Sequence, residues 1–496
     1  MIFLSMSTLE TSIPAEAAIK VGSSCKSLGD IKVKGGIELV CAKKRNTYKW
    51  KVNKRETQIS ETDYEFLNRC DKDPYVMGYL KKFQDNLDKN RYLCPPPYRF
   101  LVKTLPQITP QFPTDFESGL IETDKCKLTR SEGFQYAFDR KLTLHPDIKI
   151  QIVPFSTDQF PESSTPESDW GEYFEYLRSS LTRMTDVPSN YQFRIAPKYF
   201  RVALDLKSLN LNGSISHGDN AATNDRYKLI NEVIKVSDPE LNFSDIDYIF
   251  FVANKEVSRD ILANQIAYGK TIVTNEKSFS VNSYITSSVE DFNSKYWISR
   301  EPFSFIHEMM HIFNTAEDSY GNVEHGGDEL GTGSWGNMSG AMMDHLAWHK
   351  WNARMISDSQ IMCASTKAKS TYWIRPSTYS GQIPKLLMFP LSNYEAIAIE
   401  SIRSAGFNYK LPKSYLGALI YRINTREIDD FSEFGDGMIV LCPTNRPCSS
   451  SLEKSLPFKL SKAALKPGDY LEIEKMKIEL IDADSFGDIV KISPIE

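Results

Sequence analysis

The residues with the clearest chemical potential are His307, Glu308 and His311, which form an HExxH pattern. Residues four apart lie on the same face of a helix, so the two imidazoles can reach a single metal ion. Glu308 would then lie beside the metal, where its carboxylate can take a proton from a water molecule. This arrangement is typical of zinc metallopeptidases. Five of the seven histidines lie between His307 and His349, so histidine is concentrated around the pattern.

The sequence around the pattern predicts a helix that is buried along one side. Apolar residues recur there at helical spacing, at Phe303, Ile306, Met310 and Phe313. We expect the helix to begin after Ser299, a suitable N-cap, and to end near Asn314 or Gly321. A chance occurrence of HExxH is the alternative. Histidine is rare in this chain, however, and the helical context favours a metal-binding pair over a structural one.

Composition sets limits on the architecture and on the partners. A chain of 496 residues is too long for one ordinary core and predicts two or three domains. The hydrophobic content of 41% and the aromatic content of 12% are those of a globular protein. The net charge of −5, without a dense basic patch, argues against a nucleic-acid partner. We find no apolar run of membrane-spanning length. The HExxH pattern makes a protein or peptide substrate the expected partner.

The N-terminus and the cysteines indicate export. Residues 1–17 are interpreted as a signal-peptide remnant, because Ala15 and Ala17 before Ala18 fit a small-residue cleavage site. The positive segment of a signal peptide is missing, and a frayed apolar N-terminus is the alternative. The eight cysteines include no CxxC pair, so they predict disulfides rather than a cysteine zinc site. Cys25 with Cys41 is the one pairing that we predict. The expected location is secreted or cell-surface, by bacterial-type export.

Pattern changes along the chain predict an α+β protein with several parts. After the signal remnant we expect a small Cys/Trp module at 18–53 and a connector or pro-region-like segment at 54–145. A metallopeptidase domain at 146–364 and a β-rich domain at 365–496 follow.

Particular segments support this division. In the third part, strands are predicted at 148–153, 199–204 and 248–252, a helix beginning at 173–177, and a helix at 226–236. In the last part, alternation at 395–400, 419–423 and 470–473 predicts a β-sandwich or β-roll.

Several segments that flank the HExxH pattern resemble one known family. They are 242–248, the Trp-x-x-Met-Ser-Gly segment 335–340, 346–351, 399–403 and 417–421. Together, over about residues 146–425, the chain resembles the immune inhibitor A-like family of secreted zinc metallopeptidases. The resemblance implies a zincin-like fold, a zinc ion and hydrolysis of peptide bonds.

The third metal ligand stays open, because the chain departs from the family pattern here. The family has glycines at the positions of Met310 and Asn314, and its aspartate falls at Glu317. An insertion of one residue would instead align Asp318 with that aspartate. A catalytic zinc site needs three protein ligands and one open position. We rank Asp318 first, with Glu317 and the more distant Glu329 as alternatives.

Other residues near the motif have two interpretations each. By resemblance, Met338 would form a Met-turn beneath the metal, and a core methionine is the alternative. His345 and His349 are four apart on a predicted helix, where a surface or core pair is favoured over a second metal site. The acidic loop 325–329 is interpreted as solvated, with a calcium site as an alternative.

The predicted reaction is hydrolysis of peptide bonds by water, with Glu308 as the general base. One alternative is a non-catalytic cell-surface adhesin or wall-binding protein with a structural zinc site. An intact Glu308 argues against it, since a structural site has no use for a base. A zinc hydrolase of non-peptide bonds is a further alternative.

Overall fold

The structure of the chain is a computed structural model, and residues 23–52 and 117–495 of it fall into two separate compact units. Within these limits it describes residues 23–24, 31–34, 37–44, 47–52, 117, 119–129, 147–187, 189–211, 221–258, 261–262, 265–266, 271–279, 284–287, 303–314, 319, 331–333, 335–339, 343–367, 369–379, 381, 383–403, 408, 411, 415–426, 437–448, 460–484 and 487–495.

The first unit contains a three-stranded antiparallel sheet. Its strands, in the order β1-β2-β3, are β1 (Ile31–Lys34), β2 (Ile37–Lys44) and β3 (Thr47–Val52). The register pairs the backbone of Cys41 with that of Trp50. The sheet falls within the small module expected at 18–53. The predicted disulfide involves Cys25, which lies outside the described residues.

The second unit starts with a six-stranded, mostly parallel sheet. Its strands are β5 (Asp147–Thr157), β6 (Asn190–Ile195), β7 (Phe200–Val202), β8 (Tyr248–Ala253), β9 (Gln265–Ile266) and β12 (Tyr284–Ser287). Their order is β6-β5-β8-β12-β9, and β7 also pairs with β5. Strand β5 is parallel to β6, β7 and β8, whereas β9 is antiparallel to β12. Parallel neighbours need crossover connections. Helices α3 (Pro166–Met184) and α4 (Ala221–Ser237) lie in two of them.

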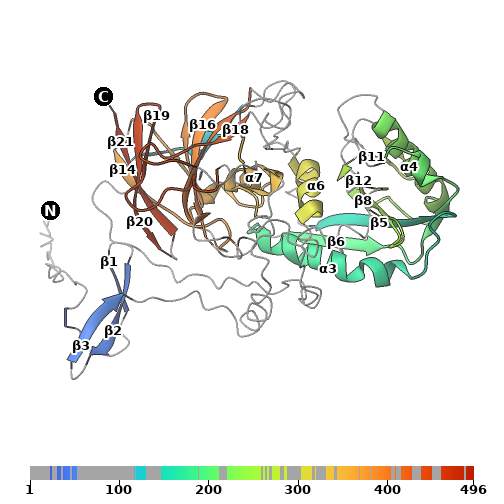
Figure 1. Cartoon of the computed structure of the whole chain (residues 1–496), viewed down its shortest axis with the longest axis horizontal. Coiled ribbons are helices and arrows are strands. Elements are labelled where there is room, and N and C mark those ends of the chain that lie inside the picture. Colours follow the sequence, from blue (N-terminus) through green and yellow to red (C-terminus); the bar gives the residue numbers. More distant parts are fainter. Residues whose placement is uncertain are drawn as a thin grey trace, which may run out of the picture. The chain divides into compact units, whose positions relative to one another are not determined.

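Helices cover both faces of this sheet (Figure 1). On one face, Ile150 and Ile152 of β5 join a core that includes α3 and helix α6 (Phe303–Asn314). On the other face, Val153 and Phe155 join a second core with α4. Successive residues of a strand point to opposite faces, so a strand that is covered on both sides is buried almost throughout.

Two further sheets form the C-terminal part. The strands are β4 (Leu120–Ile121), β13 (Ile361–Ala364), β14 (Ser370–Ile374), β15 (Leu386–Pro390), β16 (Glu395–Ile402), β17 (Gly417–Asn424), β18 (Met438–Val440), β19 (Tyr470–Ile473), β20 (Met476–Asp484) and β21 (Gly487–Pro494). One sheet has the order β18-β17-β16-β15-β13-β4, and the other β14-β21-β20-β19. Buried side chains of both sheets, such as Ile399 and Val490, share one core. Two sheets that share one core agree with the expected β-sandwich or β-roll.

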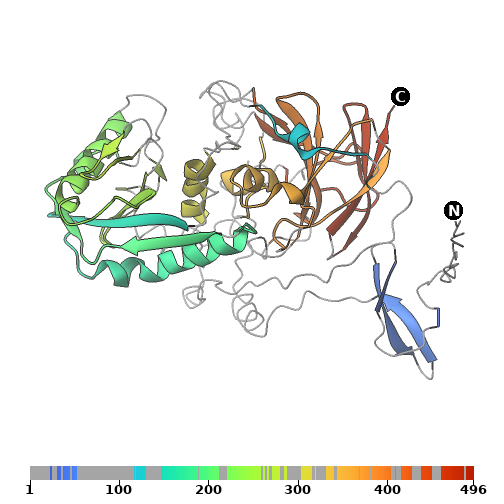
Figure 2. The same cartoon turned by 180° about the vertical axis from the view of Figure 1, so that it is seen from behind.

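A segment far away in the sequence belongs to this sandwich. Strand β4 pairs with β13, and its segment lies beside the C-terminal strands (Figure 2). A disulfide joins Cys126 to Cys363, which are 237 residues apart. Cross-links that close long loops typically stabilise a fold by about 2–4 kcal/mol. Strand β4, which falls in the expected connector at 54–145, therefore belongs to the C-terminal sheet, and the disulfide attaches the following η2 to β13.

Short elements complete the second unit. They are η2 (Thr123–Cys126), η4 (Leu206–Ser208), β10 (Ile272–Val273), β11 (Ser278–Phe279), η6 (Asn337–Ser339), α7 (Ala347–Asn352) and η7 (Asp358–Gln360). The expected α+β class is confirmed, and each strand and helix named above from the sequence has a counterpart. Helix α3 begins at Pro166, earlier than expected, because Thr165 caps it and proline suits a first turn. In the described part of the chain, the helices include none with the length and apolar character to cross a membrane.

Candidate metal centre

The helix that carries the HExxH pattern is held in place by aromatic packing. Helix α6 runs over Phe303–Asn314, as its apolar spacing predicted. The ring of Phe305, which is fully buried, lies 5.1 Å from that of Tyr173 and 5.5 Å from that of Phe250. Each side chain buried in this way contributes about 1.5–3 kcal/mol. These contacts fix the helix against α3 and β8, whereas the spacing of His307 and His311 from Phe305 directs both histidines to the other side of the helix.

The two histidines of the pattern point toward one another. Their Nε2 atoms are 3.2 Å apart, and their rings are inclined at 85°. His311 is buried, and His307 and Glu308 are half-buried. The Nδ1 atom of His307 lies 3.0 Å from the carbonyl oxygen of Asn337. A carbonyl only accepts, so Nδ1 carries the hydrogen and leaves a lone pair on Nε2.

This geometry fits a shared metal ion. Zinc–nitrogen bonds of 2.0–2.1 Å at a tetrahedral angle place two ligand nitrogens about 3.3 Å apart. The 3.2 Å between the Nε2 atoms of His307 and His311 agrees with that spacing. Ligating imidazoles typically donate their other N–H to a carbonyl or carboxylate, as His307 does. The pair therefore supplies two suitable zinc ligands.

Three carboxylates are candidates for the third metal ligand. Asp318, Glu317 and Glu329 all fall outside the described residues. Among the residues that are described, no group of three or more His, Cys, Asp or Glu side chains could hold a metal ion. The choice between the three carboxylates therefore remains a prediction.

Met338 lies beneath this helix in the short element η6, which packs against α6. It is fully buried, and its carbonyl accepts a 2.8 Å hydrogen bond from the Ser319 backbone. The neighbouring carbonyl, that of Asn337, is the one that His307 contacts. The position agrees with both interpretations made for Met338, a Met-turn and a core methionine.

His345 and His349 do not share a helix, because α7 begins only at Ala347. They are buried all the same, which agrees with a core pair and excludes a surface pair. Burial, together with repulsion from His311 and His307, lowers the pKa of His349 to about 3. The pKa of His345 is lowered well below its usual value for the same main reason. The pair is therefore neutral and adds no positive charge near the predicted metal.

Glu308 lies within electrostatic reach of a buried arginine. Arg226 of α4 is fully buried, and its Nη2 donates a 2.6 Å hydrogen bond to the Leu211 carbonyl. Burial lowers the pKa of Arg226 to about 10, and the Glu308 carboxylate opposes that shift. Arg226 was not predicted as part of the site. The sequence signal was a lone arginine within an amphipathic helix, which more often indicates a solvated position.

Buried charged residues lie in and around helix α7, and the sequence analysis did not predict them. Lys350 Nζ lies 2.5 Å from Asp344 Oδ2, and both side chains are almost entirely buried. Glu400 of β16 accepts a 3.0 Å hydrogen bond from the Ala347 N–H at the start of α7. Burial raises the pKa of Glu400 to about 7. The available signal was the position of Lys350 between Trp348 and Trp351. A charged residue that is buried within such an apolar segment usually has a partner of opposite charge.

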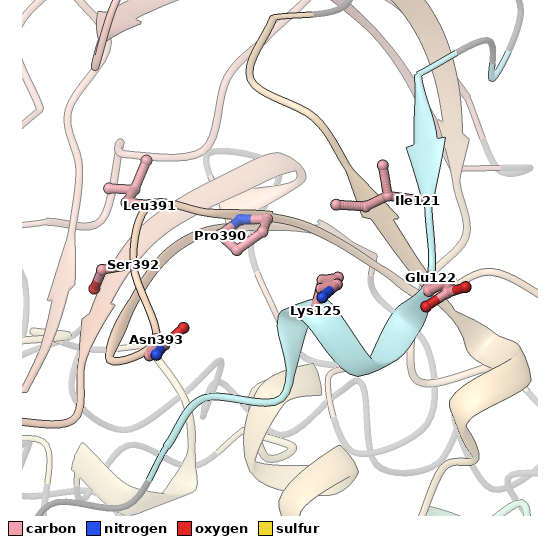
Figure 3. A pocket seen from close by; sticks show the side chains of 7 residues that line it. All are labelled: Ile121, Glu122, Lys125, Pro390, Leu391, Ser392 and Asn393. Atoms are coloured by element: carbon pink, nitrogen blue, oxygen red, sulfur yellow. The ribbon is translucent and has the colours of Figure 1, made fainter.

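A separate shallow groove of about 670 Å³ lies between η2 and the turn after β15 (Figure 3). Its lining residues are Ile121, Glu122, Lys125, Pro390, Leu391, Ser392 and Asn393. None of them is a predicted site residue, so we do not place the chemistry there.

Comparison with known proteins does not assign the chain to a family. No protein-family model matches it, and no curated protein gives a significant match.

Proposed function

We propose that the chain is a zinc-dependent endopeptidase, exported and secreted or held at the cell surface. The observation that carries the proposal is the 3.2 Å approach of the Nε2 atoms of His307 and His311, with Glu308 between them in sequence. The resemblance to the immune inhibitor A-like family and a zincin-like architecture for residues 146–364 belong to the same proposal. The parallel sheet and the position of α6 against α3 are compatible with that architecture.

Each residue of the pattern has a distinct role in this proposal. His307 and His311 would hold zinc, together with Asp318 or one of its alternatives, Glu317 and Glu329. A bound zinc ion supplies a Lewis acid for the scissile carbonyl and makes a nearby water more acidic. Glu308 is half-buried, so part of its surface is open to solvent. It accepts the proton of the attacking water and later delivers that proton to the leaving amine.

The Glu308→Gln variant tests this assignment, because glutamine keeps the shape of the side chain and cannot act as a base. We expect zinc content to stay at the level of the parent while hydrolysis of a labelled, denatured protein falls by about 10²–10⁴-fold. Zinc stoichiometry and turnover are measured on the same preparation. Glu472→Gln, at an exposed position of β19, is the matched control and retains full activity.

The outcomes separate the alternatives. Turnover near that of the parent in Glu308→Gln would refute the role of Glu308. Loss of zinc in that variant would make Glu308 a ligand rather than a base. A parent that binds zinc and hydrolyses no protein substrate would favour the adhesin with a structural zinc site.

A further inference from the structure

The carbonyl that orients His307 belongs to a short segment whose own support comes from elsewhere in the chain. Asn337 accepts from His307, and its neighbour Met338 accepts from Ser319. Two residues earlier, the Trp335 carbonyl accepts a 2.9 Å hydrogen bond from the Ser339 hydroxyl. Residues 335–339 therefore form one tightly turned unit, and whatever holds Trp335 also holds the carbonyl of Asn337.

Trp335 is anchored by the C-terminal part of the chain. Its indole Nε1–H donates a 2.8 Å hydrogen bond to the carbonyl of Leu460, which is 125 residues away. The indole is fully buried, and its ring lies 4.8 Å from that of Tyr415. Gly333 packs so closely on Leu460 that an added Cβ would lie 2.9 Å from the leucine side chain. The contact thus leaves little freedom for movement of Trp335.

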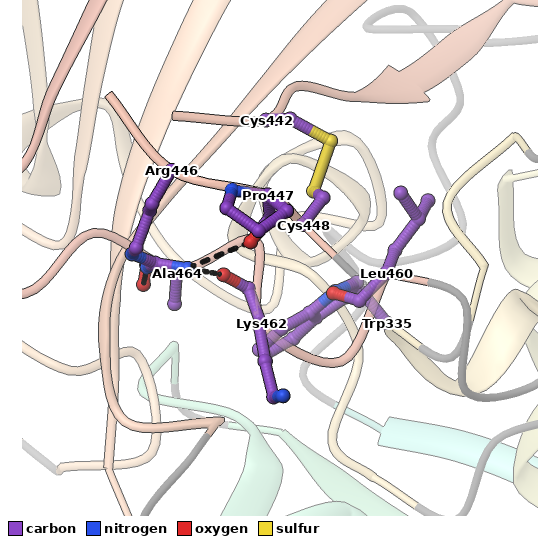
Figure 4. The surroundings of a disulfide bond; sticks show 8 residues. All are labelled: Trp335, Cys442, Arg446, Pro447, Cys448, Leu460, Lys462 and Ala464. Carbon is purple, nitrogen blue, oxygen red and sulfur yellow. Dashed lines mark hydrogen bonds between the residues drawn. A yellow bond between two sulfur atoms is a disulfide. The ribbon is translucent and has the colours of Figure 1, made fainter. Parts of the chain in front are cut away.

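The segment that receives Trp335 is in turn fastened by a disulfide-closed loop (Figure 4). Cys442 and Cys448 are joined, and the Cys448 carbonyl accepts a 3.1 Å hydrogen bond from the Lys462 N–H. Arg446, inside the loop, donates to the carbonyls of Lys462 and Ala464, at 2.7 Å in the second case. Figure 4 shows the arginine directed at these carbonyls, with Trp335 on the side of Leu460. The loop therefore holds the segment 460–464 at Lys462 and at Ala464, within four residues of the Leu460 carbonyl.

We propose that Trp335 is a positioning residue for the metal centre, and that the Cys442–Cys448 loop keeps it in place. The inference rests on the proposed zinc site. The chain of contacts runs from the loop to the segment 460–464, then to Trp335, and through the turn at 335–339 to the carbonyl that orients His307. A metal ligand whose ring is held by a fixed acceptor loses less freedom on binding, so loosening that acceptor weakens metal affinity. The C-terminal β region is in this way part of the metal centre.

The test removes one hydrogen bond at Trp335 and one at a matched tryptophan. Trp335→Phe deletes the N–H that Leu460 accepts and keeps an aromatic ring. The control is Trp351→Phe, which deletes an equally buried N–H that donates 2.9 Å to Asp358. We expect Trp335→Phe to weaken zinc binding by about 10-fold or more, the range for outer partners of a metal ligand, with little change for the control. Zinc affinity is measured by competition with a chelator.

Two additional measurements distinguish positioning from a general loss of structure. The absorption spectrum of the cobalt-substituted protein reports the geometry of the ligands, and we expect it to change in Trp335→Phe only. Replacing both Cys442 and Cys448 with serine should weaken zinc binding in the parent and have little further effect in Trp335→Phe, because the two changes act on one path. Serine replacement of the Cys126 and Cys363 pair is the control disulfide.

Each result has a defined meaning. Equal zinc affinity in the parent, in Trp335→Phe and in the Cys442/Cys448 variant overturns the inference while the proposed function stands. Additive effects of the two changes overturn the path through Trp335. If Trp335→Phe does not fold, the cysteine variant decides alone: unchanged zinc affinity overturns the inference and weaker affinity supports it. Absence of zinc binding by the parent overturns the proposed function, and the inference with it.

Discussion

Replacement of Glu400 by glutamine should change how the stability of the protein depends on pH. The Glu400 carboxyl is almost fully buried in β16, where it contacts the start of α7 and the Tyr421 hydroxyl. Burial raises its pKa to about 7 from an ordinary value of 4.5. Because the folded-state pKa lies above the unfolded value, the folded protein holds this proton more tightly than the unfolded chain does.

The sign and size of the effect follow from this difference. The stabilisation is fully present below about pH 4.5 and is lost as pH rises toward 7. A difference of about 2.5 pKa units corresponds to about 3 kcal/mol, at about 1.4 kcal/mol per unit. Glutamine is neutral at every pH and keeps an oxygen that can accept from the Ala347 N–H. We therefore expect Glu400→Gln to lose this part of the pH dependence.

The assay is urea unfolding at several pH values between 5 and 8, followed by tryptophan fluorescence. The free energy of unfolding of the parent should fall relative to Glu400→Gln by about 2.5 kcal/mol across this range, because part of the full effect is already lost at pH 5. Glu472→Gln, at an exposed position, should follow the parent. Parallel curves for the parent and Glu400→Gln would refute the burial argument.

Two further predictions concern the metal and the buried ion pair. Asp318→Ala should weaken zinc affinity far more than Glu317→Ala or Glu329→Ala, and chelator competition on the three variants checks this ranking; parent-like affinity in Asp318→Ala would contradict it. Lys350→Met should destabilise the fold by about 3–5 kcal/mol, because it leaves the Asp344 carboxylate buried without its cation. Urea unfolding measures that loss, and replacing Asp344 by leucine in the same chain should recover part of it.

Local patterns predicted the elements of the fold well, because periodicity reflects which side of an element is buried. The spacing of Ile306 and Met310 predicted a half-buried helix, and both side chains are buried in α6. Continuous apolar character at Tyr248–Ala253 predicted a buried strand, and β8 is covered on both faces. The HExxH spacing likewise predicted that two imidazoles would converge. In each case the information lies within about two turns of helix or one strand.

Local patterns of this kind do not predict contacts between distant segments of the chain. Strand β4 pairs with β13, and the disulfide joins Cys126 to Cys363, which lies 237 residues further along the chain. Nothing in the sequence near Cys126 distinguishes that partner from the other cysteines, since connectivity depends on how the sheets assemble. The connector at 54–145 was expected from a mixed, partly helical stretch that contains three consecutive prolines at 95–97, and such a pattern does not predict the two-residue strand β4.

The proposed metal centre is also supported by contacts between distant segments of the chain. The HExxH motif alone therefore describes the site incompletely. His307 is oriented by a backbone carbonyl, that of Asn337, and any residue type supplies a carbonyl. Trp335 is held by another carbonyl, that of Leu460, so its partner has no side-chain signature either. A pattern of residue types can specify ligands and a base, because their chemistry lies in side chains. In the proposed site, the carbonyls of Asn337 and Leu460 accept hydrogen bonds from His307 and Trp335, and residue types alone do not predict such main-chain contacts.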